Sequence, residues 1–93
     1  MALKARHIVV HGRVQGVGFR YFVQNAGSRL GLAGNVRNCE DGTVEIIAEG
    51  DGRGLATFIK EVEKGPALAR VTRMEIQEMP AGGHYSSFHI EGW

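Results

Sequence analysis

The segment "HIVVHGRVQGVGFRYFVQNAGSRL", residues 7–30, changes its hydrophobic period within one short loop. Residues 7–11 alternate between two faces, with Ile8 and Val10 on one side, which is typical of a β-strand. After the loop, apolar residues recur at helical spacing: Phe19, Phe22, Val23, Ala26 and Leu30. Gly31 then stands where the C-terminus of a helix favours a left-handed residue. The segment therefore predicts a strand, a loop and a helix.

The next part of the chain predicts a hairpin and a second helix. Residues 34–50 indicate two strands joined by a turn at residues 40–42, with alternate apolar residues on one face of the second strand: Val44, Ile46 and Ala48. Asp51 is the expected N-cap of a helix that ends at Gly65 and Pro66. Its inward face is apolar: Leu55, Phe58, Ile59 and Val62.

Two more extended segments, residues 70–79 and 86–93, complete the chain. The order β-α-β-β-α-β predicts an α+β fold of the ferredoxin-like type, a sandwich in which two helices pack on one face of an antiparallel sheet. Residues 1–93 are too few for more than one such domain. A right-handed crossover would place the third strand between the first two, which brings residues 14–20 and 34–38 to one edge of the sheet.

The composition excludes several classes of protein. No apolar run exceeds three residues, so neither a membrane span nor a secretory signal is expected, and we predict a cytoplasmic location. The single cysteine, Cys39, excludes an internal disulfide and a thiolate cluster for a metal. The first 39 residues carry six basic and no acidic side chains, and the remaining 54 carry five basic and ten acidic ones. The basic part suits an anion, although the charges could also simply pair across the fold.

The loop before the first helix is suited to hold that anion. The first turn of a helix leaves about four backbone N–H groups without partners, and no Ser, Thr, Asp or Asn stands here to cap them. Gly16 and Gly18 allow positive φ angles and a close approach of the backbone to a ligand. Arg20 would add a planar fork of donors that stays protonated. We therefore expect a phosphate or a carboxylate at this helix start.

Three segments resemble the acylphosphatase family: "HGRVQGVGFR" at residues 11–20, "GNVRNCEDGTVEIIAEG" at residues 34–50 and "KGPALARV" at residues 64–71. The likeness spans nearly the whole chain. The resemblance implies a metal-independent hydrolase on a ferredoxin-like fold that converts acyl phosphates to a carboxylate and inorganic phosphate and uses no cofactor. It also implies that Asn38 orients the attacking water. The phosphoryl group would be bound by Arg20 and by backbone amides: Gln15, Gly16, Val17, Gly18, Phe19 and Arg20 itself.

Two positions depart from the family pattern. Asn35 stands where the family usually has an aromatic residue, and alternation on a strand places it on the opposite face from Asn38. We expect this change to affect the edge strand more than the chemistry. The C-terminal "FHIEGW" also differs from the ending typical of the family, which leaves the role of the tail open.

The chemistry that the resemblance implies needs no side-chain base. Asn38 can accept a hydrogen bond from water and donate one to phosphate, but it cannot take a proton at neutral pH. We therefore predict a broad plateau in the pH–rate profile. The expected partners are a small acyl phosphate and phosphate-like anions. The loop offers little to recognise the acyl part, so acetyl, carbamoyl, benzoyl and glyceroyl phosphates all remain open, and a monomer is the simplest expectation.

Other functions find less support in the sequence. His7 and His11 share a strand face but lie roughly 13 Å apart, too far to bind one metal ion. Cys39 shows no arrangement typical of a nucleophile. The strands contain no aromatic platform for RNA bases, so no nucleic acid is expected. A non-catalytic anion-binding module, or the first domain of a larger carbamoyl-transferring protein, is the nearest alternative; turnover would distinguish an enzyme from a binding module.

Overall fold

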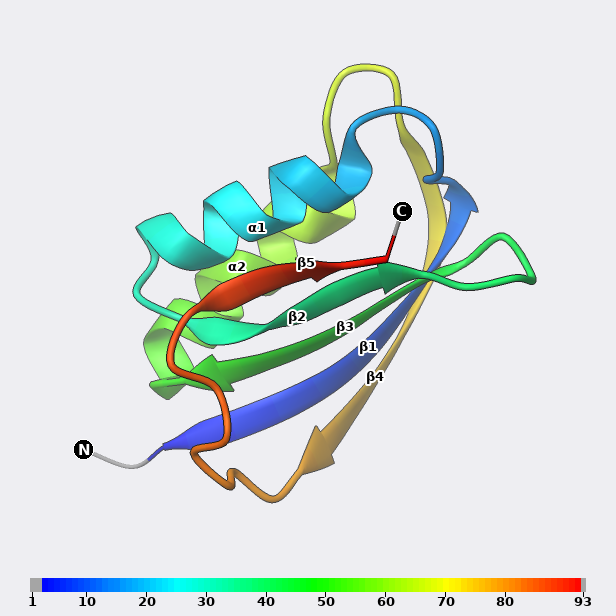
Figure 1. Cartoon of the computed structure of the whole chain (residues 1–93). Coiled ribbons are helices and arrows are strands. Elements are labelled where there is room, and N and C mark those ends of the chain that lie inside the picture. Colours follow the sequence, from blue (N-terminus) through cyan, green and yellow to red (C-terminus); the bar gives the residue numbers. More distant parts are fainter. Residues whose placement is uncertain (1–2, 93) are drawn as a thin grey trace.

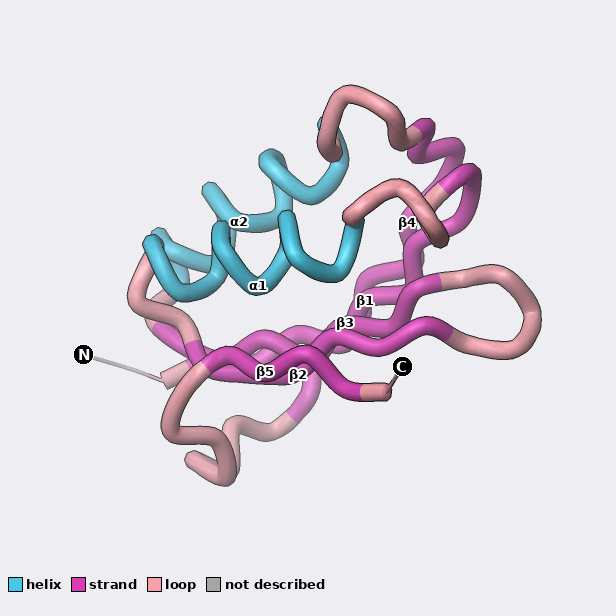
Figure 2. The backbone as a smooth tube through the Cα atoms, turned by 45° about the horizontal axis from the view of Figure 1, so that its top comes forward, coloured by secondary structure: helices cyan, strands magenta, loops and turns pink. Residues whose placement is uncertain are grey.

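The computed structural model describes residues 3–92, which form two helices and five strands (Figure 1). The elements follow one another in this order: β1 Lys4–Arg13, α1 Phe19–Arg29, β2 Ala33–Asn38, β3 Val44–Gly50, α2 Gly52–Lys64, β4 Arg70–Met79 and β5 Phe88–Glu91. Both helices lie on one face of the sheet, as Figures 1 and 2 show. The α+β, ferredoxin-like arrangement predicted from the sequence is therefore confirmed.

The strand order of the sheet is β4-β1-β3-β2-β5. Strand β3 pairs antiparallel with both β1 and β2, so the third strand does lie between the first two. The end of β1, the start of α1 and the end of β2 consequently meet at one end of the sheet. This arrangement brings residues 14–18, the glycine-rich loop between β1 and α1, to the C-terminal end of β2.

The prediction of an antiparallel sheet is wrong at one edge, because β5 pairs parallel with β2. Strand β4 ends at the end of the sheet where β2 begins, and residues 80–87 then connect the two edges (Figure 1). A strand that starts there must run in the direction of β2. On the way, the N–H of Gly83 donates a 2.8 Å hydrogen bond to the buried carboxylate of Glu49 on β3. The sheet is therefore mixed.

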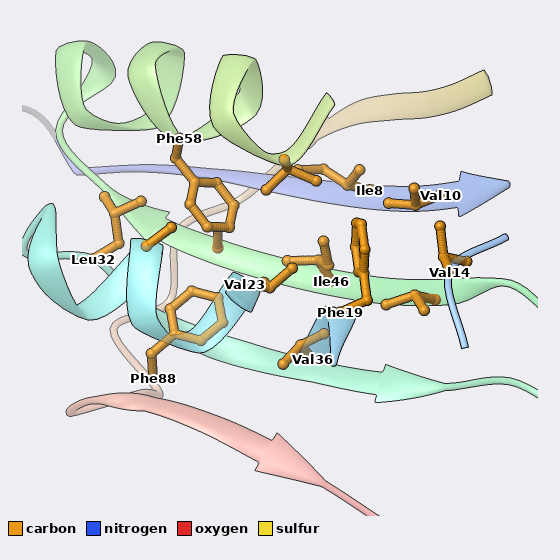
Figure 3. Close-up of a cluster of buried hydrophobic side chains, with 14 of the residues drawn as sticks. Ile8, Val10, Val14, Phe19, Val23, Leu32, Val36, Ile46, Phe58 and Phe88 are labelled. Carbon is orange, nitrogen blue, oxygen red and sulfur yellow. The ribbon is translucent and has the colours of Figure 1, made fainter. Parts of the chain in front are cut away.

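The core lies between the helices and the sheet (Figure 3). Alternate residues of β1 and β3 are fully buried as predicted: Ile8, Val10, Val44, Ile46 and Ala48. From α2, the side chains of Leu55, Phe58 and Val62 are also fully enclosed. Burying each such side chain stabilises the fold by about 1.5–3 kcal/mol.

Strand β5 reaches this core through one aromatic residue, Phe88. A Cβ atom at Gly27 of α1 would lie 2.4 Å from the Phe88 ring, so the absence of a side chain there lets α1 approach β5. The Phe88 ring packs against the ring of Phe58 with 5.7 Å between their centroids. The C-terminal strand is thus attached to α1 and α2 as well as to β2.

No helix within residues 3–92 is both long enough and apolar enough to cross a membrane.

Candidate active site

Helix α1 begins without a side-chain cap. Its N-cap residue is Gly18, in the left-handed conformation with φ 75°, and no side chain within residues 3–92 caps it with a hydrogen bond. Gly16 is also left-handed, with φ 73°, and no described atom lies within 4 Å of the position that a Cβ atom would take at either glycine. The first turn of a helix leaves its N–H groups without intrahelical partners, so the loop presents such groups and the positive end of the helix dipole to this space.

Phe19 fixes the position of this loop relative to the core. Its side chain is 1% exposed and lies near Ile46 and Val36, although its backbone belongs to the first turn of α1 (Figure 3). Because the ring is enclosed, the amides of the first turn are held in place before any ligand arrives. Such a preorganised helix start favours binding of an anion.

Arg20 is held over the sheet edge by the C-terminal strand. Its guanidinium donates a 3.0 Å hydrogen bond to the backbone carbonyl of Glu91 on β5. One helical turn further along α1, the amide of Gln24 donates to the carbonyl of Phe88 at 3.2 Å. Strand β5, which the sequence presented only as a final extended segment, therefore positions the cation of the loop.

Asn38 is the last residue of β2 and faces the same space. Its Oδ1 atom is buried, and no group in residues 3–92 donates a hydrogen bond to it. A buried acceptor without a partner costs about 1–3 kcal/mol. Such atoms are uncommon in proteins, and one that borders an anion-binding loop indicates a place for a ligand or a water molecule.

These groups line one cavity of about 190 Å³. Eight residues form its wall: Val14, Gly16, Gly18, Phe19, Arg20, Tyr21, Asn38 and Ile90. The structure thus brings together the glycine-rich loop and the end of β2, which the topology predicted from the sequence had placed side by side.

A model of the acylphosphatase family matches residues 6–90 of this sequence. The chain belongs to the acylphosphatase family. An acylphosphatase from Bacillus pumilus is 44% identical over 86 residues, which make up 92% of this chain and 96% of that protein. The crystal structure of the acylphosphatase from Bacillus subtilis superimposes with a TM-score of 0.91 at 43% identity and covers 98% of this chain and all of the other.

A much larger protein also contains this fold. The crystal structure of HypF from T. kodakarensis matches 96% of this chain with a TM-score of 0.84 and 40% identity, but the match covers only 12% of HypF. The acylphosphatase fold is therefore also found as a small part of a longer chain. The Bacillus relatives, by contrast, are covered almost entirely by the present sequence.

Not every residue predicted to bind phosphate in this acylphosphatase borders the cavity. The loop residues on its wall are Gly16, Gly18, Phe19 and Arg20, whereas Gln15 and Val17 are absent from it. The side chain of Gln15 donates hydrogen bonds of 2.8 and 2.9 Å to the carbonyls of Cys39 and Thr43. Gln15 therefore ties the glycine-rich loop to the turn that follows Asn38.

Three residues on the wall were missed by sequence reasoning, namely Val14, Tyr21 and Ile90. Val14 forms part of the buried core, and Tyr21 is the residue after Arg20 on α1. The sequence offered one signal for Tyr21, namely its position next to Arg20. It offered no signal for Ile90, because the place of Ile90 depends on which edge of the sheet β5 joins.

The charged groups on the open face of the sheet pair with one another. Arg37 donates to Glu45 at 2.6 Å, and this bond raises the pKa of the guanidinium above its ordinary value. A hydrogen bond from His7 and then those from Arg37 lower the pKa of Glu45 despite partial burial. The structure therefore places the charge of Arg37 against a carboxylate on the open face of the sheet.

His7 and His11 contact different carboxylates, those of Glu45 and Glu75. Within the part of the chain that the structure describes, no group of three or more His, Cys, Asp or Glu side chains could hold a metal ion. Asn35 donates to the Glu91 side chain at 2.6 Å and thereby links β2 to β5. The expectation that Asn35 lies on an edge strand is wrong, because β5 pairs with β2 and is itself the edge strand.

Proposed function

We propose that this acylphosphatase hydrolyses small acyl phosphates to a carboxylate and inorganic phosphate without a metal ion or a cofactor. Arg20 and the amides of residues 15–20 bind the phosphoryl group, and Asn38 positions the attacking water. Arg20 and Asn38 lie on one cavity wall with an uncapped helix start, which supports this assignment.

One observation carries the proposal, namely the buried Oδ1 atom of Asn38, which has no hydrogen-bond partner within residues 3–92. A water molecule in the cavity can donate a hydrogen bond to this oxygen, while the Asn38 amide group can donate to a phosphate oxygen. The two contacts would orient the water toward the phosphorus atom. If Asn38 had only a structural role, a hydrogen-bond partner for its Oδ1 atom would make the fold more stable, so the lack of one in the described part of the chain favours a role in binding.

The reaction asks little more of the protein than positioning and charge stabilisation. The water oxygen bonds to phosphorus as the bond to the acyl oxygen breaks, and the carboxylate leaves without needing a proton. The proton lost by the water goes to a phosphate oxygen. Arg20 and the loop amides stabilise the negative charge on the phosphoryl oxygens, which is the main source of catalysis in phosphoryl transfer.

The test is release of inorganic phosphate from acetyl phosphate by chelator-treated protein, corrected for spontaneous hydrolysis. We expect turnover that is undiminished by the chelator and competitively inhibited by inorganic phosphate. We also expect a broad plateau in kcat/KM around neutral pH, because no side chain proposed to act in the reaction gains or loses a proton there. Protein that binds phosphate but releases none from the substrate would instead be a binding module.

A further inference from the structure

Large apolar side chains are exposed at few places on this protein, and two of these places lie on the active-site cavity. Within residues 3–92 the exposed large apolar residues are Leu3, Tyr21, Leu68, Ile76 and Ile90. Tyr21 is 69% exposed and Ile90 is 37% exposed, and both belong to the cavity wall. When a ligand covers apolar surface beside a binding site and removes it from water, the free energy of binding becomes more favourable.

The two residues come from different elements, and each is the sequence neighbour of one partner in the contact between Arg20 and Glu91. Tyr21 follows Arg20 on α1, and Ile90 precedes Glu91, whose carbonyl accepts the hydrogen bond from Arg20. Ile90 pairs with Val36, a core residue of β2, which places both side chains on the face of the sheet that carries the helices. The arginine expected to bind the phosphoryl group is therefore bordered by apolar side chains.

The wall contains little that would bind a polar acyl group. Arg20 is its only charged side chain in the described chain, and Asn38 its only amide side chain. Both are assigned to the phosphoryl group and the water. A second phosphate or a carboxylate on the acyl part would find no further cation among the described wall residues, where the Tyr21 hydroxyl is the one remaining polar side-chain group.

We infer that Tyr21 and Ile90 bind the acyl part of the substrate and favour apolar acyl groups, such as aromatic ones, over small or charged ones. This inference rests on the proposed function, because it assumes that the phosphoryl group occupies the glycine-rich loop. It assigns recognition of the acyl group to α1 and β5, whereas the loop sequence alone offered nothing to distinguish one acyl phosphate from another.

The experiment compares benzoyl phosphate with acetyl phosphate in the full chain. For each substrate, kcat/KM is divided by the rate constant of spontaneous hydrolysis, which removes the difference in intrinsic reactivity. The variants are Tyr21→Ser, Ile90→Ser and the double variant. Leu68→Ser is the matched control, because Leu68 is 71% exposed in the connection between α2 and β4 and is absent from the cavity wall.

We expect wild-type protein to prefer benzoyl phosphate and the double variant to lower the benzoyl-to-acetyl ratio about tenfold, mainly through KM. Leu68→Ser should keep the wild-type ratio. Because Tyr21 and Ile90 are exposed, the variants should fold, and circular dichroism checks this. A ratio unchanged in the double variant, or lowered equally by Leu68→Ser, would overturn the inference.

A second measurement does not depend on turnover or on variants. Benzylphosphonate and methylphosphonate carry the same anionic group and cannot be hydrolysed, so the difference between their affinities for wild-type protein reports the acyl site. We expect benzylphosphonate to bind several-fold more tightly. Equal affinities overturn the acyl-site inference while leaving the proposed function intact, whereas phosphonate binding without any turnover of acyl phosphates overturns the proposed function.

Discussion

Helices α1 and α2 pack on the same face of the sheet, but their first turns are completed in different ways. In α2 the Asp51 side chain accepts a 2.7 Å hydrogen bond from the N–H of Gly54, which is an ordinary N-cap. In α1 the corresponding residue is Gly18, which has no side chain to offer and adopts a left-handed conformation. One helix start is complete within the fold, and the other is left for a ligand.

The difference is also visible in the residues that follow. The first turn of α2 includes Leu55, which is buried, whereas that of α1 buries Phe19 but also places Arg20 and Tyr21 on the cavity wall. Both helices therefore contribute to the core, but only α1 also contributes residues to the site. Substitutions at the two helix starts should therefore change different measured quantities.

The largest effect is expected for Arg20→Ala. Removing the guanidinium that stabilises a transferring phosphoryl group should lower kcat/KM by about 10³-fold or more. The side chain is not part of the core and its hydrogen bond to Glu91 is exposed, so the free energy of unfolding should fall by only about 1 kcal/mol in urea titration. Activity within tenfold of wild type in a folded Arg20→Ala protein would contradict the assigned role.

Asn38→Ala should lower kcat by about 10²- to 10³-fold, the usual cost of losing one group that is positioned for the transition state. Its stability should not fall, because the substitution removes a buried acceptor that has no partner within residues 3–92. Activity lost with stability retained or increased is the result that separates a functional residue from a structural one. A stability loss above about 2 kcal/mol would mean that Asn38 acts mainly in the fold.

Gln15→Ala tests how the glycine-rich loop is held against the turn after β2. The change removes the hydrogen bonds to the carbonyls of Cys39 and Thr43, which fix the spacing between the loop and Asn38. We expect roughly tenfold lower kcat, since small misplacements of reacting groups are costly, and about 1–2 kcal/mol lower stability. If kcat stays at the wild-type value while stability falls, Gln15 serves the fold alone.

Asp51→Ala provides the opposite case at the start of α2. Loss of this N-cap should lower the free energy of unfolding by about 1 kcal/mol, as measured by the midpoint of urea unfolding. The kcat/KM value should remain that of the wild type, because Asp51 is absent from the cavity wall. A parallel loss of activity would show that the two helix starts are not independent.

The smallest effect concerns pH. Hydrogen bonds from the hydroxyl and N–H of Thr43 lower the pKa of Asp41, and those from His7 and Arg37 lower the pKa of Glu45. Because both folded-state pKa values lie below the unfolded ones, these carboxylates stabilise the fold above about pH 4 and lose that contribution as the pH falls further.

Thermal unfolding from pH 6 to pH 3 measures this dependence. The double variant Asp41→Asn, Glu45→Gln should show a shallower fall in Tm than the wild type. Neither carboxylate belongs to the cavity wall, so the two titrations should leave the start of α1 unaffected. An unchanged slope in the double variant would assign the acid sensitivity to other groups.

The sequence predicted elements whose signals are local. The helix that ends before Gly31, the cap at Asp51 and the strand at residues 70–79 all depend on neighbours within a few positions, and the structure shows each of them. The meeting of the glycine-rich loop with Asn38 followed from the handedness of one crossover.

What could not be predicted depends on contacts between distant segments. The parallel pairing of β5 is decided by the path of residues 80–87, and four residues give too little pattern to show an edge or a direction. For the same reason, Ile90 could not be predicted as a residue of the candidate site. The contacts of Gln15 also escaped, because they join a side chain to carbonyls 24 and 28 positions away.

The hydrogen bond from Arg20 to Glu91 joins residues that are 71 positions apart in a chain of 93 residues. Contacts of such high sequence separation form late, because the entropy of closing a long loop must be overcome first. Recovery of hydrolysis after dilution from denaturant should therefore follow the slowest conformational step rather than the formation of α1. In refolding kinetics, enzyme activity would report the moment at which the last strand joins the sheet.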